Sequence, residues 1–293
     1  MPTSARPRAA RPTAPPAGRW RSAVVVGAFL VAAAVGIGVA LQHPSVGAEA
    51  LVSADSAAES PLPTGGPPPS SAPPPSSPSP SAPPNPVPST PVLQLPGPVP
   101  AHGRGSFGYD DRAGGVLGRA GVLRRFRVAV ENGSGEDVHA FGDAVQRALA
   151  GPGSWVDSGQ LRLQRVGAGS RSDFTIYLAT RDTAGRLCRA GGIDIRVGGV
   201  PYTSCRVTGK VVINLDRWRT SAPHLVAAKL PLDTYRLYVV NHEVGHQLGH
   251  HHEACPGKGR AAPVMQQQTL FLNGCRPNPW PYVGGKRYTG PSV

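Results

Sequence analysis

Apolar residues are distributed unevenly along the 293-residue chain. Residues 23–41 are uncharged and almost entirely apolar, and residues 61–100 are mostly Pro, Ser, Ala and Gly. Only from residue 101 onward do apolar and polar positions recur with the periods of strands and helices. The pattern predicts four parts: a basic cytoplasmic tail (1–22), a transmembrane helix (23–41), a disordered linker (42–100) and one folded domain (101–293).

Within the folded domain, some segments alternate with a period of two and others with a helical period. The predicted strands cover residues 124–130, 161–166, 173–179 and 210–216, and the predicted helices cover residues 136–150 and a longer stretch from about residue 232 to 249. Residues 183–209 are rich in Gly and are expected to be irregular. This order predicts the α+β class, with a small mixed sheet beside two helices.

The apolar segment 23–41 is long enough for one membrane crossing, which takes about 20 residues in a helix. Five arginines and no acid precede it: Arg6, Arg8, Arg11, Arg19 and Arg21. Such a basic flank predicts a signal anchor with the N-terminus inside. A cleavable signal peptide is the alternative, because small residues follow the segment in SVGA and AEA. Both interpretations place the folded domain outside the membrane, tethered or secreted.

The Pro-rich segment cannot bury enough apolar surface to fold, and its composition favours extended polyproline II. It serves either as a stalk that holds the domain away from the membrane or as a disordered tether.

All four cysteines lie in the folded domain, and an even number in an exported domain suggests two disulfides. Three pairings can be drawn. Cys188–Cys205 and Cys255–Cys275 are favoured because both close short loops. A four-cysteine zinc site is disfavoured because no CxxC spacing occurs.

The folded domain has 25 Lys and Arg against 14 Asp and Glu. A basic surface of this kind attracts lipid headgroups or anionic cell-envelope polymers, or it is simply a solvated face. Nucleic acid is an unsuitable partner for an exported domain with few aromatic residues.

The segment NHEVGHQLGHHHE, residues 241–253, crowds five histidines and two glutamates together. Helix positions four apart differ by about 40° around the axis, so His242 and His246 project from one face and can share a metal ion. Glu243 points about 100° away from His242. A base in that position can take a proton from a water held by the metal.

A catalytic zinc site needs a third protein ligand and keeps one position open. On a continuous helix His252 would be rotated by about 240° from His246 and would face away. Gly249 can adopt the left-handed conformation that ends a helix, after which His252 can return to the ion. The spacing therefore predicts Zn²⁺ bound by His242, His246 and His252, with Glu243 as the catalytic base.

The other polar residues of the segment have less specific predictions. His250 and His251 are expected at the surface, and Asn241 is expected to hold backbone near the helix. Glu253 either hydrogen-bonds a ligand histidine or faces water.

The full pattern HExxHxxGxxH resembles that of the metzincin zinc metallopeptidases, in which a methionine-containing turn follows. Met265, in APVMQQQT, lies thirteen residues after His252 and is the only methionine besides Met1. The resemblance implies that Met265 forms an apolar floor beneath the metal. It also implies a zincin-type fold with an edge strand above the active-site helix, where a substrate peptide could pair. Residues 210–216 (KVVINLD) are the candidate for that strand.

Residues 210–270 also resemble a family of membrane-anchored actinobacterial proteins named only as a domain of unknown function and grouped with zincin-like peptidases. The resemblance lies in NLDRW and in YVVNHEVGHQLGHHHEACPGKGRAAPVMQQQT. Gln267 stands where some metzincins have a tyrosine ligand, so no such ligand is expected. The candidates for stabilising the transition state are Gln266, Gln267, Tyr282 and Arg219.

These observations predict a membrane-tethered, extracytoplasmic zinc metallopeptidase that acts on a peptide or protein substrate. One alternative is a non-catalytic module in which zinc braces the fold, with a fourth ligand such as Cys255, while the basic surface binds the cell envelope. Another is a zinc amidase that acts on cell-wall peptides.

Overall fold

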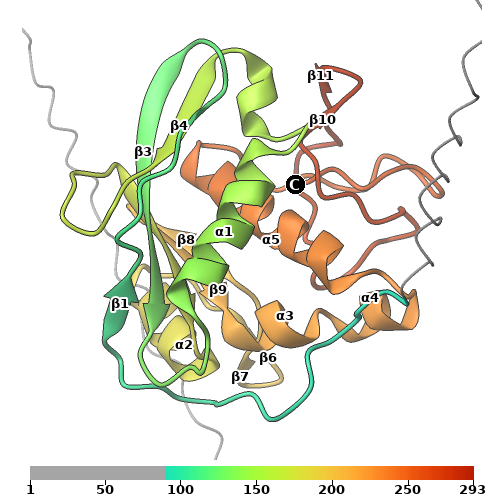
Figure 1. Ribbon diagram of the computed structural model, residues 1–293. Coiled ribbons are helices and arrows are strands. Elements are labelled where there is room, and N and C mark those ends of the chain that lie inside the picture. Colours follow the sequence, from blue (N-terminus) through green and yellow to red (C-terminus); the bar gives the residue numbers. More distant parts are fainter. Residues whose placement is uncertain (1–89) are drawn as a thin grey trace, which may run out of the picture. The chain divides into compact units, whose positions relative to one another are not determined.

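The computed structural model describes residues 90–293, and Figure 1 labels its elements. The predicted tail, the predicted transmembrane helix and most of the predicted linker lie outside these residues. Among residues 90–293, no helix is both long enough and apolar enough to cross a membrane.

A seven-stranded mixed sheet lies at the centre of the domain (Figure 1). Six strands follow the order β2-β4-β3-β5-β9-β8, and β1 pairs with one end of β3. The strands are β1 (Phe107–Tyr109), β2 (Val116–Leu117), β3 (Val122–Glu131), β4 (Leu161–Arg165), β5 (Phe174–Ala179), β8 (Cys205–Val207) and β9 (Lys210–Asn214). The inner strands β4, β3, β5 and β9 are parallel, whereas β1, β2 and β8 are antiparallel to their neighbours.

Five α-helices and one short 3₁₀ helix accompany the sheet in residues 90–293. They are α1 (Val138–Ala150), η1 (Trp155–Ser158), α2 (Arg181–Ala190), α3 (Leu215–Thr220), α4 (Pro223–Ala227) and α5 (Leu232–Gln247). Two small hairpins complete the described elements: β6 (Arg196–Val197) with β7 (Val200–Pro201), and β10 (Tyr282–Val283) with β11 (Lys286–Arg287).

The central strands are nearly continuous apolar runs because helices cover both of their faces. In the register of β5 with β9, Ile176 pairs with Val211 and Tyr177 pairs with Val212. Val211 belongs to the large core beneath α1 and α5, and Val212 belongs to a smaller core beneath α2. Alternate residues of one strand therefore serve two separate cores.

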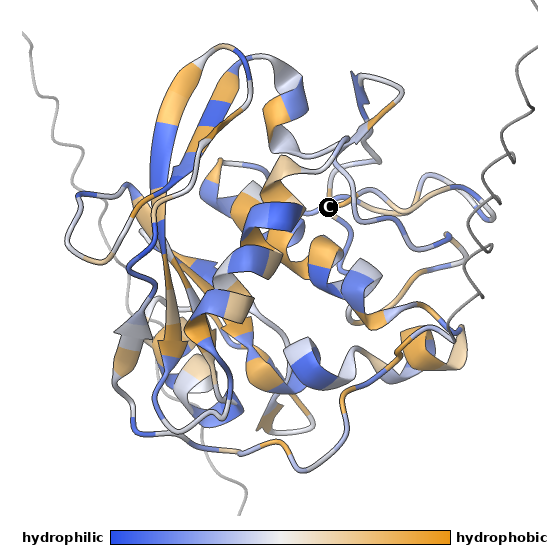
Figure 2. Cartoon of the chain, viewed as in Figure 1, coloured by the Kyte–Doolittle hydropathy of each residue, from blue (hydrophilic) through white to orange (hydrophobic). Residues whose placement is uncertain are grey.

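Helix α1 shows why the local sequence folds as predicted. Asp137 caps its N-terminus by accepting a hydrogen bond from the Ala140 amide at 2.7 Å. Phe141, Val145 and Leu149 recur at helical spacing and are fully or almost fully buried. Figure 2 shows the corresponding alternation of hydrophobic and hydrophilic residues around the helix. This apolar stripe packs against the sheet and α5.

Most sequence predictions of secondary structure are confirmed. The α+β class and the mixed sheet are correct, and the four predicted strands and two predicted helices correspond to β3, β4, β5, β9, α1 and α5. The last predicted strand is shorter than expected, because the Asn214 side chain accepts a hydrogen bond from the Asp216 amide and starts α3.

Two expectations are wrong. Residues 183–209 are not irregular, because they contain most of α2 and three short strands. Residues 210–216 do not supply the sheet edge, because β9 lies between β5 and β8. The edge strand is β8, whose three residues are too few to show a period in the sequence.

The end of the predicted linker packs on the domain. The Leu95 amide donates to the Arg219 carbonyl at 2.8 Å, and the Val92 carbonyl accepts from the Leu232 amide at 2.8 Å. Leu95 and Val99 are partly buried against the large core. Some residues before 101 thus pack on the folded domain, which the sequence predicted to begin at residue 101.

Both predicted disulfides are present, Cys188–Cys205 and Cys255–Cys275. The first joins α2 to the edge strand β8, and the second closes the loop that follows the histidine-rich segment.

Candidate metal centre

Helix α5 supplies the first two histidines of the site. His242 is buried and His246 is half-buried, one turn further along the same face. The Nδ1 of His242 donates to the Val264 carbonyl at 2.8 Å, and the Nδ1 of His246 donates to the His250 carbonyl at 2.8 Å. These bonds fix both rings and leave each Nε2 as the free nitrogen.

A glycine turn returns the third histidine to the site. The helix ends at Gln247, and Gly249 has a φ of +96°, in the left-handed region that favours glycine. The Nε2 atoms of His246 and His252 lie 3.1 Å apart, and the ring centroids of His242 and His252 lie 5.4 Å apart. The predicted turn and the predicted convergence of three histidines are therefore present in the fold.

The three imidazoles fit a metal ion. One nitrogen from each ring lies within 4.8 Å of the corresponding atoms of the other two. Two ligands of a tetrahedral zinc at about 2.0–2.1 Å would lie about 3.3 Å apart. The 3.1 Å between His246 and His252 is close to this value. Zn²⁺ thus suits both the spacing and the donor atoms.

Burial keeps the cluster uncharged. It lowers the pKa of His242 to about 3 and that of His252 to about 4, and nearby His246 adds to both shifts. Neutral imidazole is the form that binds a metal. Burial has the opposite effect on the adjacent carboxyl, raising the pKa of Glu243 to about 8.

A turn beneath α5 connects the ligand segments. The Val264 carbonyl accepts from His242, and the Met265 carbonyl accepts from the Glu253 amide at 3.1 Å. Met265 is fully buried and packs closely under Gly245, where an added Cβ would lie 2.5 Å from the Met265 sulfur. The absence of a side chain at position 245 leaves room for the Met265 side chain and the Trp155 ring against the helix between the ligand histidines.

An aromatic stack holds the loop between His246 and His252. The His250 ring stacks on Trp155 with centroids 4.3 Å apart, and the Arg287 guanidinium lies 5.0 Å from the centroid of the Trp155 ring. The Trp155 Nε1 donates to the Asn241 carbonyl at 2.8 Å. His250 is therefore half-buried in this stack, whereas His251 is exposed as expected.

The C-terminal residues brace the segment that carries His252. Glu253 accepts hydrogen bonds from Arg287 at 2.9 Å and from the Gly290 amide at 3.3 Å. The Val293 amide donates to the His252 carbonyl at 3.3 Å. Glu253 thus neither bonds a ligand histidine nor simply faces water, the two roles left open by the sequence.

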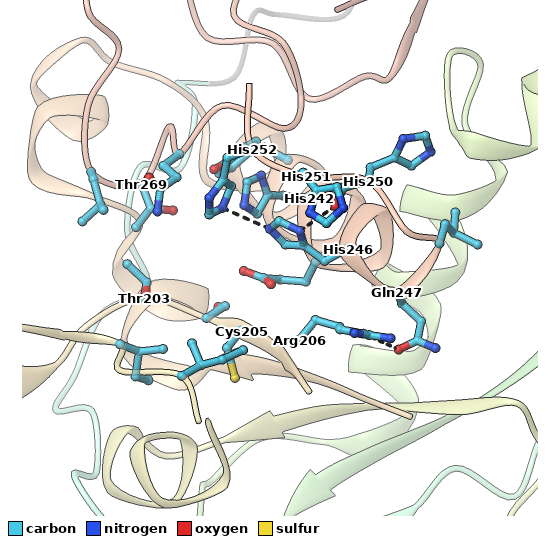
Figure 3. A pocket seen from close by; sticks show the side chains of 18 of the residues that line it. Thr203, Cys205, Arg206, His242, His246, Gln247, His250, His251, His252 and Thr269 are labelled. Atoms are coloured by element: carbon cyan, nitrogen blue, oxygen red, sulfur yellow. Dashed lines mark hydrogen bonds between the residues drawn. The ribbon is translucent and has the colours of Figure 1, made fainter. Parts of the chain in front are cut away.

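The histidines open into a cavity of about 610 Å³ (Figure 3). Glu243 lies in it beside His242 and His246. β8 and the residues before it form part of its lining, and Gln267, Thr269 and Leu270 form another part. This volume is large enough for several residues of an extended peptide.

The remaining predicted residues have separate places. Gln267 lines the cavity. The Gln266 side chain is buried and its Nε2 donates to the Phe271 and Leu272 carbonyls, while Arg219 forms a 2.6 Å ion pair with Glu136. Tyr282 lies on β10 and does not line the cavity. Asn241 holds backbone as expected, because its Nδ2 donates to the Ala148 carbonyl at 3.2 Å.

Several residues of the site were not predicted, among them Trp155 and Arg206. Trp155 reaches it from η1, and Arg206 reaches it from β8. No motif marks either residue, because their proximity to α5 depends on the fold of the sheet.

Comparison with known proteins identifies the family. A family model described as "Protein of unknown function (DUF3152)" matches residues 95–283, so the chain belongs to this family. The match covers the histidine-rich segment, the Met265 turn and both disulfides. No curated protein and no solved structure matches the chain.

Proposed function

We propose that this member of the DUF3152 family is a zinc-dependent peptidase. In this proposal His242, His246 and His252 hold the metal, and Glu243 is the general base. The observation that carries the proposal is the convergence of three neutral imidazoles beside a buried carboxyl, in a cavity wide enough for a peptide.

Zinc at this position would lower the pKa of a bound water to near neutrality and would polarise the scissile carbonyl. Glu243 would take a proton from the attacking water and deliver it to the leaving amine. The raised pKa of this buried carboxyl suits the second transfer, and the positive charge of a nearby cation would favour the ionised form needed for the first.

The remaining motif residues also support a metzincin-like arrangement. Met265 would form the apolar floor beneath the metal, and Gly249 would set the turn that brings His252 back. The two disulfides fit an extracytoplasmic domain. A membrane tether at residues 23–41 completes the proposal.

A purely structural zinc site is disfavoured by two observations. Cys255 is bonded to Cys275 and so does not offer a fourth ligand. Glu243 lines the cavity beside the histidines, whereas a metal site that only stabilises the fold needs no such base.

The proposal is tested with Glu243→Gln in the full-length chain. This variant is expected to keep about one zinc per chain and to lose roughly 10²–10⁴-fold or more in peptide cleavage, because a general base contributes at least that factor. Zinc is measured by elemental analysis, and cleavage by profiling new N-termini in exported proteins. Purified wall peptides form a parallel arm that detects an amidase.

The matched control is Asp233→Asn, which removes an exposed carboxylate from the same helix. It should cleave as the wild type does. Wild-type cleavage by Glu243→Gln, or a wild-type chain without bound zinc, contradicts the proposal.

A further inference from the structure

The cavity extends along α5 on both sides of the histidine cluster. Tyr238 and Gln247 both line it and are nine residues apart, which is about 13 Å along a helix axis. Thr269 and Leu270 accompany the Tyr238 end, whereas Arg206 lies at the Gln247 end. A peptide crossing the metal centre would therefore meet different chemistry on its two sides.

Arg206 is held in a defined position at the Gln247 end of the cavity. In the register of β8 with β9 it pairs with Val211, so its side chain lies on the sheet face that carries α5. Its Nε donates to the Gln247 Oε1 at 3.0 Å, a contact visible in Figure 3. This bond anchors one edge of the guanidinium and leaves both Nη groups available.

The charge of Arg206 has no partner within residues 90–293. None of the described carboxylates forms an ion pair with it, and its bond to Gln247 involves a neutral amide. The lining contains two acids, Glu243 and Asp194, and Arg196 already binds Asp194 at 2.7 and 2.8 Å. The Gln247 end of the cavity thus carries a positive charge that no ion pair of the described residues neutralises.

We propose that Arg206 binds a carboxylate of the substrate and makes the cleft selective for peptides that carry one on the Gln247 side of the scissile bond. This inference rests on the proposed function, since it assigns the substrate class of the same site. A guanidinium with two free Nη groups binds a carboxylate through two parallel, charge-assisted hydrogen bonds. The carboxylate belongs either to an acidic side chain or to the peptide's C-terminus.

Binding of hydroxamate peptides tests this inference without requiring turnover. The full-length chain with Glu243→Gln is loaded with Zn²⁺ and titrated with short peptides whose hydroxamate anchors them to the metal. One series is N-blocked and carries Glu or Gln at each of three positions before the hydroxamate. The other extends in the opposite direction from the hydroxamate, carries Glu or Gln at each of three positions, and ends in a free carboxylate or an amide. Comparing the Glu/Gln pairs with the carboxylate/amide pairs distinguishes an acidic side chain from a terminal carboxylate.

The acid form is expected to bind about tenfold more tightly than its neutral partner in one of the two series, a difference of about 1.4 kcal/mol. Adding Arg206→Gln should reduce that preference to less than about twofold, and Arg206→Lys should retain part of it because the charge remains without the planar fork. Arg171→Gln is the matched control: it removes an exposed arginine that does not line the cavity, and it should leave the preference unchanged.

Zinc content is measured in the same samples and distinguishes a failure of the role of Arg206 from a failure of the proposed function. Bound zinc with no acid preference in either series, or a preference that survives Arg206→Gln, overturns the role of Arg206 alone. A chain that binds no zinc overturns the proposed function and this inference with it. Thermal unfolding of Arg206→Gln shows why a preference is lost. An unchanged Tm means that only the contact with the carboxylate is lost. A lowered Tm means that the cavity wall is disturbed, and the proposal then stands only if Arg206→Lys restores both the Tm and part of the preference.

Discussion

Two clusters in this domain each gather three side chains of the kinds that bind metals. The first consists of His242, His246 and His252, and the second of Asp110, Asp111 and His139. In each, the three ligand atoms lie within 4.8 Å of one another. Proximity alone does not distinguish them, but their surroundings do.

The charge of the second cluster is already neutralised. Asp110 is fully buried and forms ion pairs with Arg112 at 3.1 Å and Arg165 at 3.0 Å. Burial opposes the ionised form, yet the hydrogen bonds from Arg112 and the charge of Arg165 outweigh it and lower the pKa of Asp110. Asp111 and His139 lie at the surface and bond each other at 3.0 Å.

The histidine cluster has the opposite design. Carbonyl oxygens bind the outer nitrogens of His242 and His246, and the inner nitrogens face one another. Neutral imidazoles bring lone pairs together without bringing cations, so a metal ion would stabilise the histidine cluster. Asp110, by contrast, would have to give up its ion pairs with two arginines in order to bind one metal ion. Compensation by neighbouring charges is therefore the better criterion for a metal site.

The largest expected effect is on zinc affinity, when one member of each cluster is replaced by alanine. His246→Ala should weaken zinc binding by more than the roughly 10–100-fold that loss of an outer-sphere partner costs. His139→Ala should leave zinc affinity within about twofold, because the arginines already satisfy Asp110. Competition with a chromophoric chelator measures both. Weakened zinc binding in His139→Ala would show that the wrong cluster has been assigned.

The second effect concerns stability. Asp110→Asn removes the buried one of the two carboxylates that pair with Arg165, the other being the partly exposed Asp143, and should lower the free energy of unfolding by about 3 kcal/mol. The zinc content should not change. Asp111→Asn, at an exposed position of the same cluster, should change stability by less than about 0.5 kcal/mol. Urea denaturation of the three proteins provides the measurement, and equal effects at both positions would contradict the distinction.

A smaller effect is expected at the brace of the histidine site. Arg287→Gln removes the ion pair with Glu253 and the cation above Trp155, so the segment carrying His252 should be held less firmly. Zinc affinity should fall by about tenfold, which is the lower end of the range of losses caused by removing an outer-sphere partner of a metal ligand. Lys286→Gln, an exposed neighbour, should bind zinc as the wild type does.

The smallest effect is a dependence on pH. The folded pKa of Asp110 is lowered, so its contribution to stability is present above the unfolded pKa of about 3.9 and is lost as pH falls through the folded value. The stability difference between wild type and Asp110→Asn should therefore shrink below about pH 4. Urea titrations at several acidic pH values test this, and a difference that stays constant down to pH 2 would refute it.

The sequence predicts the histidine site well because its geometry is local. His242 and His246 follow from helical spacing, and the return of His252 follows from the conformational freedom of Gly249. The disulfides were also predictable, since both close loops of about twenty residues. The second cluster was not predicted, because Asp110 and Arg165 come from distant segments.

Helix α2 and the cleft wall formed by β8 were missed for two different physical reasons. Helix α2 buries mainly small or polar side chains, including Thr183, Ala184 and Gly185, so it shows no apolar stripe. Strand β8 has three residues, and Arg206 approaches Gln247 only because the sheet places β8 beside the end of α5. Both features depend on tertiary packing.

The Cys188–Cys205 disulfide encloses much of that wall in its own loop. The three zinc-binding candidates, by contrast, lie together between His242 and His252, outside the loop. Under the proposed function, the residues that hold the metal and much of the wall that faces the substrate therefore belong to separate stretches of chain, which could vary independently in evolution. In engineering terms the disulfide-bounded loop would then be a replaceable cassette: exchanging it together with Arg206, the residue directly after it, is expected to change substrate selectivity while the three histidines keep their places.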